Sequence, residues 1–223
     1  GWNNLIKKKI KSILPQSVQV FFQNKHFYKS LPNKIKTIIS ELNKNDICID
    51  CGGNLGMATY LFASYKSKVF CFEPDPGAYQ HLEKRFKNNN LITIYNKAVG
   101  IKNGKCYLYQ HPNINDDPER YSEASSLIPS KPNVSKKGIE IEMINLSHFL
   151  QSIEKVKILK IDIEGYEAKL IPMLIKDKCL DKVDHVFLET HEKKWPELRN
   201  DLDKMFSKIR KSVYNTKFHF DWP

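Results

Sequence analysis

Residues 49–56 read IDCGGNLG, and this short stretch decides the fold. An apolar run ends in Asp50, a turn with Gly52 and Gly56 follows, and a helical pattern begins at Asn54. Glycine adopts backbone conformations that other residues avoid, and it lets the chain approach a ligand closely. The first N–H groups of a helix lack partners within the helix and are free to bind a ligand. The stretch therefore predicts a strand, a ligand-binding turn and a helix.

The spacing of this turn points away from a dinucleotide. The glycines of the turn follow G-x-x-x-G and not G-x-G-x-x-G, and Asp50 closes the strand. A pyrophosphate at the turn would be repelled by Asp50, whereas a ligand with an ammonium group or a ribose would not. An ordinary connection between a strand and a helix, without a ligand, is the alternative reading of the turn.

The same alternation of strand and helix continues along the chain from residue 46. Near-continuous apolar strands that alternate with helices indicate an α/β domain with a mostly parallel sheet and helices on both faces. We find neither a repeat nor a second domain, and we assign residues 46–223 to this domain. The predicted strands lie at 47–50, 68–73, 91–95, 158–162 and 183–189, and the predicted helices between them at 54–65, 76–87 and 166–175.

Residues 1–45 form a helical segment that precedes the domain. Apolar residues recur near helical spacing in the first 30 residues, with lysines between them, and a second helix follows Pro32. We expect this segment to pack on the core. A basic helix that lies on a membrane surface is the alternative for residues 1–30.

The composition is that of a basic globular protein. The 223 residues include 36 Lys and Arg against 25 Asp and Glu, a net charge of +11. This charge permits nucleic acid, an anionic membrane or an acidic metabolite as partner, but we favour a solvated lysine-rich surface as its explanation. The sequence contains neither an apolar run of membrane-spanning length nor a signal peptide pattern, so we expect a cytoplasmic protein.

The five cysteines are an odd number, typical of reduced thiols. Cys48 and Cys51 match C-x-x-C, but the pair lies within a strand and its exit turn. We therefore expect neither redox nor zinc chemistry there.

Two further turns suit the binding of a nucleoside, one through an acid and one through small residues. The second strand ends in Phe72-Glu73-Pro74, and Glu73 lies 23 residues after Asp50. An acid at this position is placed to bind the hydroxyls of a ribose, with Pro74 fixing the turn. The turn after the third strand, residues 96–100, is made of small residues and could line an adenine slot.

Residues 160–167 read KIDIEGYE and bring acids to the carboxyl edge of the sheet. Asp162 and Glu164 end the fourth strand of the alternation, and Glu189 and His191 end the next. Carboxylates gathered at one edge repel one another, so they need a cation, a proton or a ligand. These four residues could bind Mg²⁺, but no spacing rule supports that, and we predict no metal. Solvated strand ends, with Glu167 at a helix start, are the alternative.

Together these motifs resemble the FkbM family of class I, S-adenosylmethionine-dependent methyltransferases. The resemblance runs from about residue 46 to 191, and its most specific part is Lys160–Gly165. The matching motifs are 50–56, Phe72-Glu73-Pro74, Ala98-Val99-Gly100, Ser125-Ser126-Leu127 and 160–165. The resemblance implies a Rossmann-like sheet of about seven strands, the last from residues 212–222, with an antiparallel edge strand.

The resemblance also implies S-adenosylmethionine as cofactor and methyl transfer to a hydroxyl, often on a sugar, nucleotide sugar or glycoconjugate. An alcohol must lose a proton during the reaction, and a carboxylate or histidine can accept it. We predict that Glu164 or His191 accepts that proton and that Asp162 lies nearer the methionine moiety. The residues predicted to bind the cofactor are Asp50, Gly52, Asn54, Gly56, Glu73, Pro74, Asn96, Ala98, Ser126 and Asp162.

Two other functions compete with this reading. A nucleic-acid methyltransferase would use the positive charge, but Asp162-Ile163-Glu164-Gly165 replaces the Pro-Pro-aromatic motif of amine methylation, and acids at the site would repel phosphates. A non-catalytic cofactor-binding module could instead dock through its basic N-terminal helix. The irregular segment 111–137 and the C-terminal tail are expected to determine the acceptor, a small molecule or glycan that the sequence does not name. The sequence does not reveal the oligomeric state either.

Overall fold

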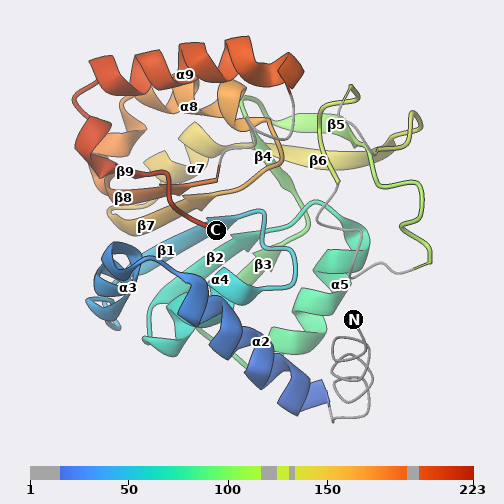
Figure 1. The fold of residues 1–223 in the computed structure, drawn as a ribbon, viewed down its shortest axis with the longest axis vertical. Coiled ribbons are helices and arrows are strands. Elements are labelled where there is room, and N and C mark those ends of the chain that lie inside the picture. The colour runs from blue at the N-terminus through green and yellow to red at the C-terminus, as the bar shows by residue number, and fades with distance from the viewer. Residues whose placement is uncertain (1–15, 117–124, 131–133, 190–195) are drawn as a thin grey trace, which may run out of the picture.

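The main sheet of the protein has six strands, all paired in parallel. The computed structural model describes residues 16–116, 125–130, 134–189 and 196–223 (Figure 1). The strand order is β3-β2-β1-β7-β8-β9. Its strands are β1 (Ile47–Cys51), β2 (Lys68–Phe72), β3 (Ile92–Tyr95), β7 (Val156–Ile161), β8 (Val183–Leu188) and β9 (Phe218–His219).

Helices cover both faces of this sheet, because successive strand residues point to opposite sides. Ile49 and Leu159 pack in one apolar cluster with α7, α8 and α9. Cys48 and Ile158 pack in another with α3 and α4. Figure 1 shows α8 and α9 side by side on one face. The helices are α2 (Gln16–Ser30), α3 (Asn33–Ser40), α4 (Met57–Ser64), α5 (Pro76–Phe86), α7 (Leu146–Gln151), α8 (Glu167–Lys176) and α9 (Arg199–Lys211), and the short 3-10 turns are η2 (Cys179–Lys182), η3 (Pro196–Leu198) and η4 (Asn215–Lys217).

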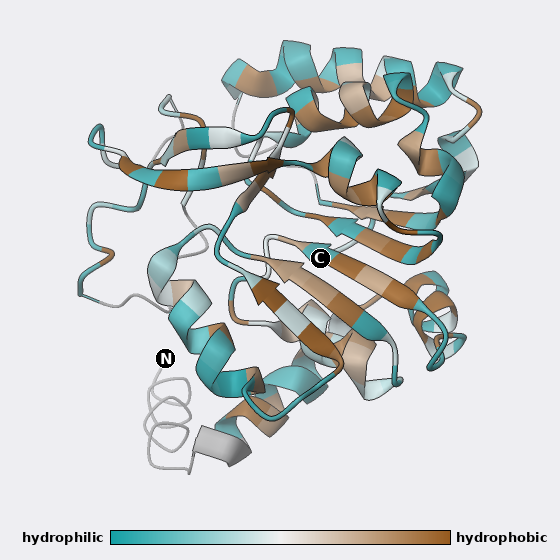
Figure 2. Cartoon of the chain, turned by 180° about the vertical axis from the view of Figure 1, so that it is seen from behind, coloured by the Kyte–Doolittle hydropathy of each residue, from teal (hydrophilic) through white to brown (hydrophobic). Residues whose placement is uncertain are grey.

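A second sheet of three strands, not predicted from the sequence, packs on the face of the main sheet that α7, α8 and α9 also cover. It has the order β4-β6-β5, with β4 (Ala98–Gly100), β5 (Gly104–Leu108) and β6 (Ile139–Asn145). Along β6, Ile141 and Met143 are buried while Glu140 and Glu142 are exposed. Figure 2 shows this alternation of hydrophobic and hydrophilic residues. The alternation is the mark of a strand with one buried face.

The predicted antiparallel edge strand is wrong for the main sheet. β9 pairs in parallel with β8, and the main sheet has six strands rather than seven over the described residues. The reason is α9, which separates β8 from β9 along the chain. A helical crossover returns the chain in its original direction, so the next strand is parallel. Among the described strands, β5 and β6 of the second sheet pair in antiparallel fashion, and an isolated antiparallel bridge joins Tyr109 to Ser126.

The N-terminal helices pack against the second face of the sheet. Ile35 and Ile39 of α3 are fully buried, and Phe27 of α2 lies edge-on to Trp222, with 5.5 Å between ring centroids. Phe21 and Phe22 of α2 point outward and are exposed. Residues 1–15 lie outside the described residues, so membrane contact through residues 1–30 and a domain start at residue 46 stay predictions. Among the helices that the structure describes, none combines the length and the apolar character needed to cross a bilayer.

The cysteines of the C-x-x-C sequence lie on opposite faces of β1. Cys48 belongs to the cluster with α3 and α4, and Cys51 to the cluster with α7, α8 and α9. Burial raises the pKa of Cys48 to about 12 and also raises the pKa of Cys51 well above its ordinary value. Two protonated thiols on opposite sides of a sheet cannot act as a pair, which agrees with the prediction of inert thiols.

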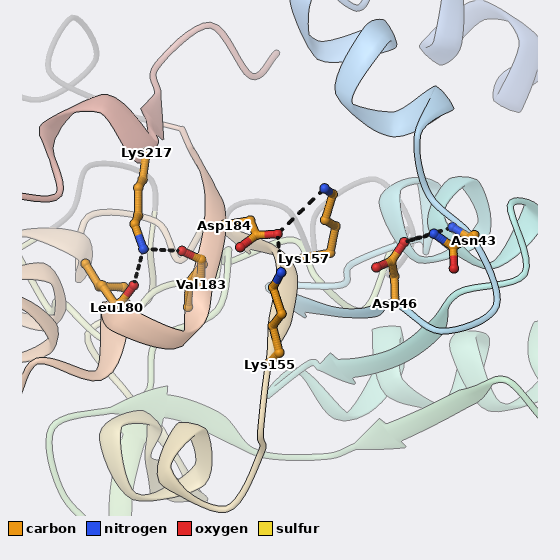
Figure 3. A network of polar contacts seen from close by, with 8 residues as sticks. All are labelled: Asn43, Asp46, Lys155, Lys157, Leu180, Val183, Asp184 and Lys217. Atoms are coloured by element: carbon orange, nitrogen blue, oxygen red, sulfur yellow. Dashed lines mark hydrogen bonds and ion pairs between the residues drawn. The ribbon is translucent and has the colours of Figure 1, made fainter.

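The amino edge of the sheet is fixed by local polar contacts (Figure 3). Asp184, near the start of β8, forms ion pairs with Lys155 at 3.2 Å and Lys157 at 3.6 Å. Asp46, which precedes β1, accepts hydrogen bonds from the backbone and side-chain amides of Asn43 at 2.9 and 2.8 Å. The pairs of Asp184 join the beginnings of β7 and β8, whereas the bonds of Asp46 fix the turn that leads into β1.

Candidate active site

Two glycines allow the turn after β1 to pack against neighbouring strands. Gly52 has φ of +85°, and a Cβ on it would lie 1.9 Å from the carbonyl oxygen of Asp162. A Cβ on Gly53 would lie 2.2 Å from Sγ of Cys71 in β2. Other residues are therefore excluded by sterics at both positions, and at Gly52 by backbone conformation as well. The turn is held tightly between the ends of β2 and β7.

The amide groups of this turn are bonded within the protein. The N–H groups of Gly52 and Gly53 donate to the carbonyl of Phe72 at 2.9 and 3.1 Å, and that of Gly56 donates to Gly53 at 2.7 Å. The N–H of Asn54 donates to Oε2 of Glu73 at 2.7 Å. A phosphate-binding turn presents such N–H groups to its ligand. This turn uses four of them internally, so its geometry disfavours a pyrophosphate.

Glu73 is a buried carboxylate at the tip of β2. Its side chain accepts one bond from Asn54 and a second, at 2.8 Å, from the N–H of Asp75. Burial raises the pKa of Glu73 to about 7, and the charge of Asp75 adds to this, although the two amide bonds oppose it. The residue is only 6% exposed. Glu73 is thus held by two backbone amides beside the glycine turn, and its predicted contact with a ribose stays a prediction.

Asn96 supports the turn that follows Glu73. Its side-chain amide donates to the carbonyl oxygens of Glu73 at 2.9 Å and Pro74 at 3.2 Å. Ala98 is buried at the start of β4. The described contacts of Asn96 are therefore with the backbone beside Glu73, and a direct role of Asn96 or Ala98 in cofactor binding stays a prediction.

Asp50 lies beneath the glycine turn and is fully buried. It accepts a hydrogen bond from the hydroxyl of Thr59 at 2.7 Å and forms an ion pair with Nζ of Lys160 at 3.1 Å. The same ammonium donates to the carbonyl of Gly52 at 2.7 Å and lies 3.6 Å from Asp162. Burial favours a lower pKa for Lys160, but the carboxylates of Asp50 and Asp162 outweigh it and raise the pKa above its ordinary value.

The sequence analysis assigned no role to Lys160 or Thr59. The described contacts of Asp50 are with Thr59 and Lys160, and a direct contact of Asp50 with the cofactor stays a prediction.

The site lies at the point where the strand order reverses. β1 pairs with β2 on one side and with β7 on the other, and the N–H of Asp162 donates to the carbonyl of Cys51 at 3.1 Å. In open α/β sheets, ligands bind outside the carboxyl ends of the strands at this switch point. Asp162, Gly52 and Glu73 are therefore gathered where such a fold places its ligand.

Two serines attach the irregular segment to both sides of this edge. Ser125 donates to Oδ2 of Asp75 at 3.1 Å, and Ser126 donates to the carbonyl oxygen of Glu164 at 2.8 Å. Gln110 also donates to Oδ2 of Asp75, at 2.7 Å. Asp75 immediately follows the tip of β2, whereas Glu164 follows β7. The segment is thus fastened across the edge, through Asp75 and Gln110, which the sequence analysis did not single out.

Comparison with known proteins identifies the family. The family described as "Methyltransferase FkbM domain" matches residues 50–216, more than half of the chain. The chain belongs to the FkbM methyltransferase family. The match begins at Asp50 and includes every element of the site above, while α2 and α3 lie outside it.

Three curated relatives of this FkbM protein carry methyltransferase names. "Methyltransferase 1" of Beauveria bassiana is 24% identical over 66% of this chain and 65% of its own length. "Hexuronic acid methyltransferase AglP" of Haloferax volcanii is 23% identical over 84% of this chain and 72% of its own. "2-O-methyltransferase NoeI" of Sinorhizobium fredii is 25% identical over 61% of this chain and 60% of its own. The chain thus spans less than two thirds of the first and third relatives.

The remaining predicted residues of this FkbM domain differ in how far the structure places them. Glu164 follows β7 with φ of +56°, and Glu189 follows β8. Glu167 is fully buried in the first turn of α8 and accepts the N–H of Ile163 at 2.7 Å, as the helix-start interpretation requires. His191 lies outside the described residues. Within those residues, groups of three or more His, Cys, Asp or Glu suited to a metal ion are absent.

Proposed function

We propose that this protein uses S-adenosylmethionine to methylate a hydroxyl of a sugar, nucleotide sugar or glycoconjugate. The observation that carries the proposal is Glu73. It is a buried carboxylate at the tip of β2, fixed by two backbone N–H groups beside a glycine turn at the switch point of the sheet. A rigid carboxylate in this position can accept hydrogen bonds from both hydroxyls of a ribose.

The chemistry of the surrounding groups fits the rest of this cofactor. The turn amides are bonded internally, which suits a nucleoside without phosphates. Asp50, Asp162 and Lys160 together carry one net negative charge, which suits a ligand with a sulfonium and an ammonium group. When bound, the cofactor supplies an activated methyl group, so the protein mainly orients the acceptor and takes up its proton. Gly52 and Asp162 would lie at the amino-acid end, and Asn96 and Ala98 near the base.

The names of two relatives support a sugar hydroxyl as acceptor. One relative is named a hexuronic acid methyltransferase and another a 2-O-methyltransferase. An acceptor hydroxyl must lose its proton, and Glu164 or His191 is our candidate base. Ser126 bonds to the backbone of Glu164, so the segment around Ser126 would lie close to the acceptor.

Cofactor binding is tested by calorimetry with S-adenosylmethionine and its demethylated product. Glu73→Ala removes the two ribose contacts, at about 2–4 kcal/mol, and should weaken binding at least ~30-fold. Glu154→Ala, which removes an exposed carboxylate, is the matched control and should leave binding unchanged. Unchanged affinity in a folded Glu73→Ala protein would refute the ribose assignment.

Catalysis is tested with labelled cofactor and a panel of uronic acids, nucleotide sugars, glycolipids and RNA. Turnover on a sugar supports the proposal, and turnover only on RNA would replace it with the nucleic-acid alternative. Cofactor binding without turnover across the panel would favour the non-catalytic module. On the true acceptor, loss of the base should lower turnover by roughly 10²–10⁴ while cofactor affinity stays within about threefold. Near wild-type turnover in both Glu164→Gln and His191→Ala would show that neither residue is the base.

A further inference from the structure

Lys160 is a buried cation that joins three segments of the candidate site. It lies in β7, directly opposite Asp50 of β1 in the parallel register. Its side chain is 6% exposed, and its ammonium meets the Asp50 carboxylate, the Gly52 carbonyl and the Asp162 carboxylate at 3.1, 2.7 and 3.6 Å. The three oxygens come from the end of β1, the glycine turn and the end of β7, the two strands that flank the switch point.

Packing alone does not require a lysine at this position. The neighbours Leu159 and Ile161 fill β7 with fully buried apolar side chains. Burying an ammonium costs free energy unless charged or polar partners replace its water. The ammonium of Lys160 therefore has to be understood through its contacts and not through the volume that it fills.

The contact with Lys160 fixes the backbone at Gly52, a residue without a side chain that could hold it in place. The Gly52 N–H is bound from the β2 side by Phe72, and the Gly52 carbonyl is bound from the β7 side by Lys160. Glycine has the largest conformational freedom of any residue, and here it is held at φ of +85° from two directions. Without the ammonium, the carbonyl would lose this donor, and Asp50 and Asp162 would lose the cation that they share.

We propose that Lys160 is the positioning residue of this site. Its ammonium sets the glycine turn and Asp162 in the arrangement that receives the cofactor, before the cofactor arrives. The same ammonium compensates the negative charge of Asp50, so that Asp50, Gly52 and Asp162 share one cation. This inference rests on the proposed cofactor site and adds a residue that acts through others without touching the reacting atoms.

The test compares Lys160→Met with three other variants, one of them Asp50→Asn alone. Lys157→Met is the matched control, because Lys157 lies in the same strand and pairs with Asp184 at the opposite edge. Asp50→Asn combined with Lys160→Met removes the unpaired charge while the Gly52 carbonyl still lacks its donor. The double variant should fold even where Lys160→Met alone is too unstable to study.

Two measurements separate positioning from simple stabilisation. Amide hydrogen exchange of the ligand-free protein should rise at least tenfold in the peptide over residues 51–57 of the Lys160 variants, with little change in α9. Affinity for S-adenosylmethionine should fall about 10- to 100-fold in Lys160→Met, as expected for a lost hydrogen bond to a charged group. In the double variant the melting temperature should recover while the affinity stays at least tenfold below that of Asp50→Asn alone, the reference that accounts for any direct contact of Asp50 with the cofactor. Lys157→Met should change neither exchange in the turn nor affinity.

Several outcomes would overturn the proposal. If the affinity of the double variant recovers to that of Asp50→Asn together with the melting temperature, Lys160 only balances the charge of Asp50 and does not position the turn. Wild-type exchange and affinity in the Lys160 variants would remove any role in positioning. A wild-type protein that does not bind S-adenosylmethionine would contradict the proposed function, and the exchange of residues 51–57 would still decide whether Lys160 sets the turn.

Discussion

Both edges of the main sheet contain Asp–Lys ion pairs, but these pairs lie in different environments. At the amino edge, Asp184 pairs with Lys155, whose side chain is 68% exposed (Figure 3). At the carboxyl edge, Asp50 pairs with Lys160, and the two side chains are 0% and 6% exposed. Water can replace a lost partner at the first edge and cannot at the second. The comparison shows that burial, and not the presence of an ion pair, turns charged residues into a fixed site.

This difference sets the scale of the expected effects. Exposed ion pairs contribute about 0–1 kcal/mol to the free energy of unfolding, because solvent screens them. Removing one partner of a buried pair costs about 3–5 kcal/mol, since the other charge is left without compensation. Substitutions at the carboxyl edge should therefore be severe and those at the amino edge mild.

The largest loss of stability is expected for Gly52→Ala. Its Cβ would lie 1.9 Å from the backbone oxygen of Asp162, and the residue would keep a positive φ. We expect a loss of about 3–5 kcal/mol in the free energy of unfolding, measured in urea, from strain and overpacking together.

Gly104→Ala is the control for this substitution. Gly104 also has a positive φ, of +131°, but a Cβ on it would meet nothing within 4 Å. Its substitution reports backbone strain alone and should cost clearly less than Gly52→Ala. Equal losses would mean that the close approach to β7 does not limit residue 52.

A pH-dependent loss of stability is expected from Glu73. Burial raises its pKa from 4.5 to about 7 in the folded protein. Between these values the folded state binds more protons than the unfolded state, so the free energy of unfolding falls as pH rises. Between pH 5 and 8 the contribution should fall by about 2–3 kcal/mol relative to Glu73→Gln, which does not titrate. Parallel pH profiles of unfolding for the two proteins would contradict the raised pKa.

The sequence was informative wherever a feature depends on residues close together in the chain. The turn at 50–56 and Glu73 were predicted because β1 and β2 are adjacent in sequence and in the sheet. The direction of β9 was also encoded, since Leu202, Met205 and Ile209 recur at helical spacing before it, but that helix was not recognised. The second sheet was missed although β6 alternates, because β4 has only three residues and β5 buries only Leu108.

The parts of the site that sequence reasoning missed depend on distant contacts. Lys160 bonds to Gly52 across 108 residues and Ser125 bonds to Asp75 across 50. Propensity and periodicity describe neighbouring residues and contain no information about such pairs. Lys160 belongs to the most specific motif, but its neighbours Asp162 and Glu164 are conventional ligands and were considered first. Without knowledge of its partners, a lysine within an apolar strand is interpreted as a surface residue.

A smaller effect is expected where the irregular segment joins the carboxyl edge. Ser125→Ala removes one bond to Asp75, but Gln110 still donates to the same carboxylate oxygen. We expect a loss of about 1 kcal/mol and a fall in melting temperature of roughly 2–4 °C. The KM for the acceptor should rise more than the Kd for the cofactor. An equal change in both would show that the segment supports the whole site and not the acceptor side.

The smallest effect is expected at the amino edge, for Asp184→Asn. Asp184 pairs with Lys155 and Lys157 at 3.2 and 3.6 Å, and its side chain is 29% exposed. Water and salt screen such pairs, so the loss in the free energy of unfolding should be about 0.5 kcal/mol or less. The difference from wild type should shrink further in ~0.5 M salt, where the screening length is only a few ångströms. A loss of about 3–5 kcal/mol in the free energy of unfolding, as for a buried pair, would contradict this expectation. It would mean that side-chain exposure does not explain the difference between the two edges.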